Sequence, residues 1–177
     1  MKKQEKINIL QAGVSGKGMC RCYFCYDPGF FYCYPNEVND TFLLAQEEDD
    51  FILDGYFIRK ITHLKKVEMR LDLCHEINEC FGITEQIAHP GVDISSWKSI
   101  FESLMKKDTY VIIEDCIGGK IAIGVIEKVL KSKLYFKRFN AKGIWDEKIM
   151  EIPYSSITGV EWGTRYDVMW KKYLEQG

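Results

Sequence analysis

The residues best suited to chemistry in this 177-residue chain are its cysteines, four of which lie close together near the N-terminus. Soft ligands of the kind that zinc prefers are offered by Cys20, Cys22, Cys25, Cys33 and the Cys74–His75 pair. A strand would place Cys20 and Cys22 on one face and Cys25 on the other. Free cysteine is also a common core residue. The spacing therefore favours structural thiols, with a zinc site through the N-terminal cysteines as an alternative.

Other catalytic patterns in the chain are incomplete. Cys74 and His75 are adjacent on a predicted helix, where neighbouring side chains diverge by about 100° and cannot pair. The glycine-rich segment 13–18 lacks the serine or threonine that follows the lysine of a phosphate-binding loop. The acidic runs 47–50 and 146–147 are typical of solvated loops. We therefore expect no catalytic residue, no metal, no cofactor and no enzyme activity.

The second half of the chain shows a regular succession of elements. Apolar residues at helical spacing predict a helix over 97–105, capped by Ser95 or Ser96. Five strands and a closing helix follow, over 110–114, 120–129, 133–139, 147–152, 157–162 and 167–174. A one-turn step at 153–156 precedes the fifth strand. This order is typical of a small SH3-like or Sm-like barrel, and Gly124 would supply its sharp bend.

The first half resembles a divergent copy of the same plan. Strands over 19–26 and 30–34 flank the turn residues Asp27–Pro28–Gly29, a register that would pair Phe24 with Cys33. The segment 58–64 echoes 154–160. The predicted fold class is mainly β with minor α, as tandem small barrels joined by a helical connector; one larger mixed sheet is the alternative. The predicted domains are 1–81 (barrel-like, with a trailing helix), 82–107 (the connector) and 108–177 (a five-stranded barrel with a closing helix).

The C-terminal region carries four short motifs in a fixed order. They are WDE at 145–147, IPYxxITxV at 152–160, GxRY at 163–166 and YL at 173–174. In this order they resemble the C-terminal signature of a group of small bacterial proteins with an SH3-like or Sm-like barrel. The resemblance implies a bacterial, cytoplasmic setting, but it carries no activity and no catalytic residue.

Two surfaces are predicted to bind partners. Aromatic residues beside arginine are typical of binding hot spots, and here they are Trp145, Tyr154, Trp162, Arg165 and Tyr166. The same residues could instead cap a small barrel. A basic hairpin over 120–142 could bind single-stranded RNA through Lys128, Lys131, Lys133, Tyr135, Lys137 and Arg138. Alternatively, the same lysines could belong to an edge hairpin whose charges prevent edge-to-edge aggregation of the sheet.

Composition limits the remaining function classes. The 24 basic and 26 acidic residues give a net charge of −2, which argues against a nucleic-acid coat or a membrane-surface protein. No apolar run is long enough for a signal peptide or a membrane-spanning helix. Seven cysteines without scaffold spacing favour reduced thiols and a cytoplasmic location. The sequence thus predicts a non-enzymatic protein–protein interaction module, with RNA binding and zinc binding as alternatives.

Overall fold

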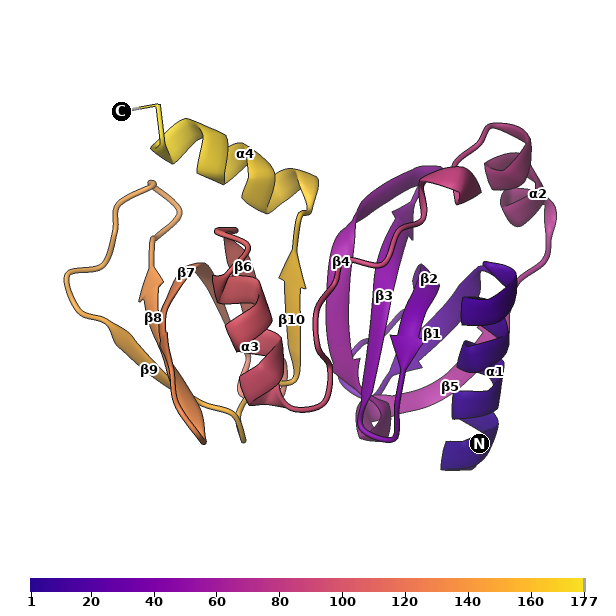
Figure 1. Cartoon of the computed structure of the whole chain (residues 1–177), viewed down its shortest axis with the longest axis horizontal. Coiled ribbons are helices and arrows are strands. Elements are labelled where there is room, and N and C mark those ends of the chain that lie inside the picture. Colours follow the sequence, from indigo (N-terminus) through magenta and orange to yellow (C-terminus); the bar gives the residue numbers. More distant parts are fainter. Residues whose placement is uncertain (177) are drawn as a thin grey trace. The chain divides into compact units, whose positions relative to one another are not determined.

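The computed structural model describes residues 1–176, and the chain divides into two compact units, Met1–Pro90 and Gly91–Gly177 (Figure 1). Ten strands and four α-helices occur in the described part of the chain, which confirms the mainly β class with minor α. No described helix combines the length and the apolar character needed to cross a bilayer.

Unit 1 is a five-stranded antiparallel sheet with a helix before it and a helix after it. Its elements are α1 (Lys3–Gly16), β1 (Cys20–Phe24), β2 (Phe31–Val38), β3 (Phe42–Asp49), β4 (Ile52–Lys60), η1 (Ile61–His63), β5 (Leu64–Met69), α2 (Leu73–Cys80) and η2 (Thr84–Gln86). The strand order within the unit is β5-β1-β2-β3-β4. Helix α1 contacts β2 and β5, and Ile7 and Leu10 carry its apolar side into the core.

The register of β1 and β2 differs from the predicted one. Cys20 lies opposite Cys33 and Cys22 lies opposite Phe31, so the expected pairing of Phe24 with Cys33 is wrong. The reason is that 25–30 forms a longer loop rather than a tight turn. Tertiary contacts hold that loop, because the Cys25 amide donates to the His63 carbonyl at 2.8 Å and Asp27 pairs with Arg59 of β4.

A buried cation stabilises this side of unit 1. Arg59 is only 3% exposed, and its guanidinium lies 3.0 Å from the Asp27 carboxylate. The Arg59 Cζ atom also lies 4.4–5.6 Å from the centroids of four aromatic rings, those of Phe24, Tyr26, Phe31 and Phe57. Charge and ring faces together provide the environment that a desolvated guanidinium requires.

The acidic run 47–50 is not the solvated loop that its composition predicts. Its first three residues belong to β3, and Glu48 is buried. The Glu48 carboxylate accepts hydrogen bonds from the Phe51 amide at 2.8 Å and from the Asn78 side chain of α2 at 3.4 Å. The turn itself is Asp50 and Phe51, both at positive φ. Contacts from α2, which are distant in sequence, thus decide where Glu48 lies.

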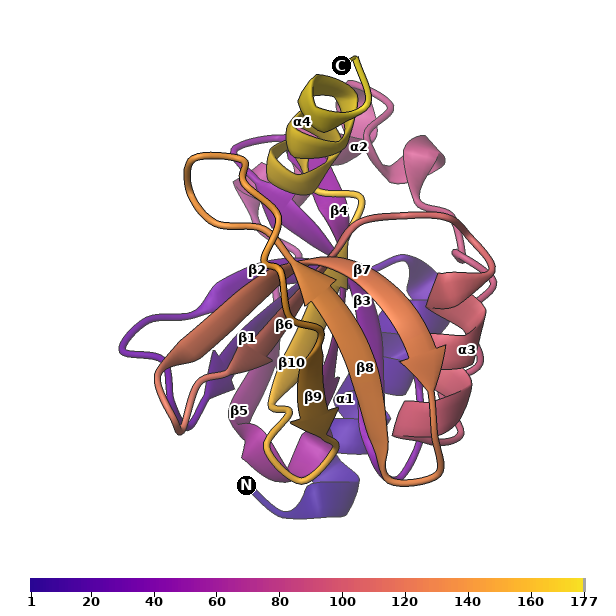
Figure 2. The ribbon, with the colours of Figure 1, turned by 90° about the vertical axis from the view of Figure 1, so that its left-hand side faces the viewer.

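Unit 2 repeats the order of elements seen in unit 1. They are α3 (Trp97–Met105), β6 (Val111–Asp115), β7 (Lys120–Val129), β8 (Lys133–Arg138), β9 (Met150–Pro153), β10 (Gly159–Trp162) and α4 (Arg165–Leu174), and the strands run β10-β6-β7-β8-β9. The predicted serine cap is confirmed at Ser96, whose hydroxyl accepts from the Ser99 amide at 3.1 Å. Helix α3 contacts β7, and Figure 2 shows β7 and β8 bending strongly.

Both units place their fifth strand beside their first, after a one-turn step. In unit 1 this step is η1; in unit 2 it is the turn in which the Ser156 and Ile157 amides donate to the Pro153 and Tyr154 carbonyls at 3.1 and 3.3 Å. Within the described residues, no pairing joins the fourth strand of either unit to its own fifth strand. Each unit is therefore an open sheet with the same strand order.

Gly124 allows β7 to pair closely on both sides. It lies opposite Val111 of β6 and opposite Arg138 of β8. A Cβ atom at this position would lie 2.0 Å from the Lys137 carbonyl oxygen, well inside van der Waals contact. Glycine is therefore required by the approach of β8, as the sequence predicts for a strongly bent strand.

Acid should weaken unit 1 through His63. Burial, and then the nearby Lys60 cation, lower the pKa of His63 below its ordinary value of 6.5. Between the lowered pKa of folded His63 and the ordinary value of 6.5, the unfolded chain binds more protons than the folded one. The stability of unit 1 that is present above pH 6.5 is therefore lost as the pH falls through the lowered pKa. We expect His63→Gln to flatten the decline in unfolding free energy between about pH 7 and pH 5, measured by urea unfolding. Equal slopes for both proteins would contradict this assignment.

Candidate functional site

The predicted aromatic patch is divided between the core and the surface of unit 2. Trp162 is buried in β10. Tyr154 stacks on Phe101 of α3 with ring centroids 5.8 Å apart, and its hydroxyl donates to the Leu130 carbonyl at 2.8 Å. Arg165 is exposed at the start of α4. Tyr154 and Trp162 are thus held by packing, and they do not form a shared face with the other members.

Trp145 and Tyr166 belong instead to one row of aromatic contacts. The Trp145 ring meets Phe139 with centroids 5.3 Å apart, and Phe139 meets Trp170 of α4 at 5.1 Å. Trp170 in turn contacts Tyr166 at 6.3 Å and Tyr173 at 6.2 Å. This row leads from the loop after β8 onto α4.

Helix α4 presents apolar side chains on its outer side. Tyr166, Met169 and Tyr173 are 58%, 62% and 68% exposed, and with Trp170 they repeat at i, i+3, i+4 and i+7. These four residues, with Ala141 and Lys142, line a cavity of about 460 Å³. We call it the α4 groove. Met169, Trp170 and Tyr173 are absent from the predicted patch, although their helical spacing with Tyr166 could have indicated them.

A buried capping box fixes the start of α4. The Thr164 hydroxyl accepts from the Asp167 amide at 3.2 Å, and the Asp167 carboxylate accepts from the amides of Gly163 and Thr164 at 3.0 and 2.7 Å. Burial raises the pKa of Asp167, although these hydrogen bonds oppose the rise. The reciprocal bonds set the direction of the helix and so the orientation of its exposed apolar side.

The basic hairpin does not present a continuous cationic face. Lys133 pairs with Glu151 of β9 at 2.8 Å, and Arg138 pairs with Asp146 at 2.8 Å. Two ammonium groups lie over rings of the same unit: Lys133 over Tyr135 and Lys137 over Trp145. Lys128 and Lys131 are exposed. Neighbouring carboxylates thus compensate part of the charge that phosphate binding would use.

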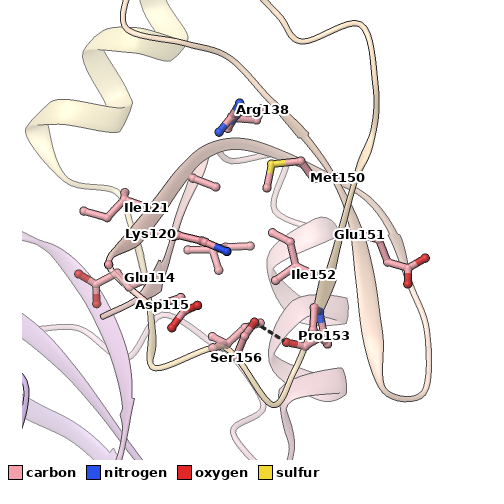
Figure 3. A pocket seen from close by; sticks show the side chains of 14 residues that line it. Glu114, Asp115, Lys120, Ile121, Arg138, Met150, Glu151, Ile152, Pro153 and Ser156 are labelled. Atoms are coloured by element: carbon pink, nitrogen blue, oxygen red, sulfur yellow. Dashed lines mark hydrogen bonds between the residues drawn. The ribbon is translucent and has the colours of Figure 1, made fainter. Parts of the chain in front are cut away.

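A second hollow lies between β6 and β7 on one side and β9 on the other (Figure 3). Its volume is about 450 Å³, and we call it the β7–β9 pocket. Its walls are mostly aliphatic, with a few charged side chains at the rim: Glu114, Asp115, Lys120, Arg138 and Glu151. A cavity of this size and composition is typical of small-molecule sites.

The clustered thiols are part of the core of unit 1. Cys20, Cys22 and Cys33 are fully buried, with the sulfur atoms of Cys22 and Cys33 3.7 Å apart. Burial raises the pKa of Cys20, and the Cys22 contact together with burial raises that of Cys33. Such thiols are poor nucleophiles. All seven cysteines are free, and residues 1–176 contain no group of three or more His, Cys, Asp or Glu side chains placed to hold a metal ion.

A buried polar network joins α2 to the sheet of unit 1. The Tyr34 hydroxyl accepts from the Asn78 side chain at 3.0 Å and lies 3.3 Å from Nδ1 of His75. Burial raises the pKa of Tyr34 to about 12. Asn78 also reaches Glu48. These contacts anchor α2 on the sheet of unit 1.

No protein-family model matches the chain, and no curated protein or solved structure gives a significant match. The resemblance of the C-terminal region therefore stays a prediction. Two hollows of unit 2, the α4 groove and the β7–β9 pocket, are the features that could bind a ligand or a partner.

Proposed function

We propose that this chain is a non-enzymatic protein-binding module and that the α4 groove is its binding site. The observation that carries the proposal is the row of exposed side chains Tyr166, Met169 and Tyr173 along one helix, with the half-buried Trp170 between them. Large apolar side chains of this kind are costly to leave in water, and Tyr, Trp and Met are enriched at protein interfaces. A groove lined by them supports recognition of a partner helix.

The charges around the α4 groove favour an acidic partner segment. Lys142 lines the groove and is exposed, and Lys172 is exposed on the same helix, whereas the acid Glu175 pairs with Lys171 at 2.6 Å. We therefore commit to an amphipathic helix with Asp or Glu beside its apolar stripe. Opposite charges at the rim would speed encounter and fix the register.

The kind of fold that each unit adopts is a second proposal. We infer that each unit is a small, partly open barrel of SH3-like or Sm-like type, and that the two form a tandem repeat. The shared strand order and the one-turn step before each fifth strand support this. A bacterial cytoplasm suits seven free thiols, three of them fully buried.

Peptide selection tests the proposed site. From a displayed library of random peptides, we expect the full chain to select sequences with apolar residues at helical spacing and acidic flanks. The double variant Met169→Ser/Tyr173→Ser should bind them about tenfold or more weakly, because each lost anchor is worth over 1 kcal/mol. Ile117→Ser is the matched control, since Ile117 is 74% exposed in the same unit but distant from the groove residues in sequence.

Two outcomes would contradict the proposal. One is selected peptides that bind the double variant as well as the parent chain. The other is tight, steeply salt-dependent binding of a random RNA pool that is lost on charge reversal at Lys133 and Lys137, which would assign function to the basic hairpin instead.

A further inference from the structure

The β7–β9 pocket offers an apolar interior that the proposed peptide site does not use. Ile113, Ala122, Ile152 and Ile157 line it and are each less than 10% exposed, so its walls are firmly held. Met150 adds a flexible thioether side chain. At about 450 Å³ the pocket has room for a compact aliphatic group and a polar head.

Three of the five charged residues around this pocket are engaged elsewhere. Arg138 pairs with Asp146, and Glu151 pairs with Lys133 and points away from the hollow in Figure 3. Glu114 is nine-tenths buried and has an interaction of its own. Arg138 and Glu151 could neutralise a ligand charge only by losing an existing ion pair.

The other two charged residues, Asp115 and Lys120, are of opposite sign and lie opposite each other on β6 and β7. Lys120 extends into the space between β7 and β9, and Asp115 lies at the floor near Ser156 (Figure 3). Within the described residues neither forms an ion pair; Asp115 only accepts a hydrogen bond from the Gly118 amide at 2.7 Å. Besides its aliphatic walls, the pocket thus holds an acid and a base, Asp115 and Lys120, that form no ion pair within the described residues.

We propose that the β7–β9 pocket binds a free α-amino acid with an aliphatic side chain. The ligand carboxylate would meet the Lys120 ammonium, the ligand ammonium would meet the Asp115 carboxylate, and the side chain would contact Ile113, Ile152 and Met150. A zwitterion satisfies both charges, whereas a ligand with a single charge forms only one of the two charge-assisted contacts. This site is independent of the α4 groove.

Calorimetric titration of the full chain with leucine tests the inference. We expect millimolar or tighter binding of leucine, and binding about tenfold weaker or undetectable for 4-methylpentanoate, which lacks the amine, and for 3-methylbutylamine, which lacks the carboxylate. Glycine should also bind poorly, because it has no side chain for the aliphatic walls. This series uses the unmodified protein, so misfolding cannot explain its result.

A pair of variants on one strand locates the site. Lys120→Met should weaken leucine binding about tenfold, whereas Lys128→Met, an exposed position on β7 outside the pocket, should leave it unchanged. No heat of binding with leucine, equal affinity for 4-methylpentanoate, or equal effects of the two lysine variants would each overturn the proposal.

Discussion

Gly124→Ala should lower the free energy of unfolding of unit 2 by about 3 kcal/mol. The added methyl group would lie 2.0 Å from the Lys137 carbonyl oxygen, so β7 and β8 must move apart or lose their pairing. The four tryptophans, Trp97, Trp145, Trp162 and Trp170, all lie in unit 2. Tryptophan fluorescence during urea unfolding therefore reports this unit alone.

Gly29→Ala is the matched control for this substitution; because Gly29 lies in unit 1, the stability of this variant is followed by circular dichroism. Nothing lies within 4 Å of a Cβ atom at Gly29, and its φ is not in the left-handed region. We expect a change of less than about 0.5 kcal/mol there. A Gly124→Ala protein as stable as the Gly29→Ala protein would show that β8 can give way, and the close approach would not be a constraint on the fold.

Asp27→Ala should destabilise unit 1 more than Arg59→Met does. Without Asp27 the Arg59 guanidinium, 3% exposed, loses a carboxylate partner at 3.0 Å, and we expect a cost of about 3 kcal/mol. Arg59→Met leaves the Asp27 carboxylate, which is 23% exposed and can be hydrated, while methionine fills the space among the rings. That variant should cost about 1 kcal/mol or less.

Urea unfolding followed by circular dichroism measures this difference, with Asp40→Ala as a control. Asp40 pairs with Lys3, but its side chain is 85% exposed, so its removal should have little effect. The reverse order, with Arg59→Met the more damaging change, would show that contacts of the cation with the rings outweigh the ion pair.

Elements governed by local spacing could be predicted from the sequence, whereas those governed by distant contacts could not. The serine cap of α3 and the bend at Gly124 both follow from short-range rules. Helix α1 is not predicted because Gly13 and Gly16 weaken its helical pattern. Tertiary packing explains why one of these two glycines is present. A Cβ atom at Gly13 would lie 3.1 Å from the Cys20 sulfur and from Pro35, so glycine lets the helix approach the sheet.

The candidate site could be predicted only in part, because contacts between residues distant in the sequence decide which side chains are buried and which line a cavity. Tyr166 follows from composition, but composition also favours Trp162, and only burial separates the two. The β7–β9 pocket combines residues from β6, β7 and β9 that are up to 40 positions apart, from Ile113 to Pro153. Its acid and base, Asp115 and Lys120, are unremarkable in the sequence, because their role depends on which other charges already have partners.

The placement of the buried thiols lets their rate of chemical modification report the opening of one unit. All three fully buried sulfurs, those of Cys20, Cys22 and Cys33, belong to unit 1, while unit 2 has a single cysteine, Cys116. A thiol reagent can modify the three sulfurs only when the core of unit 1 opens. Their rate of modification therefore records opening of unit 1, while indole fluorescence records unit 2. One native sample, with no label added in advance, can thus show whether the two units open together or separately.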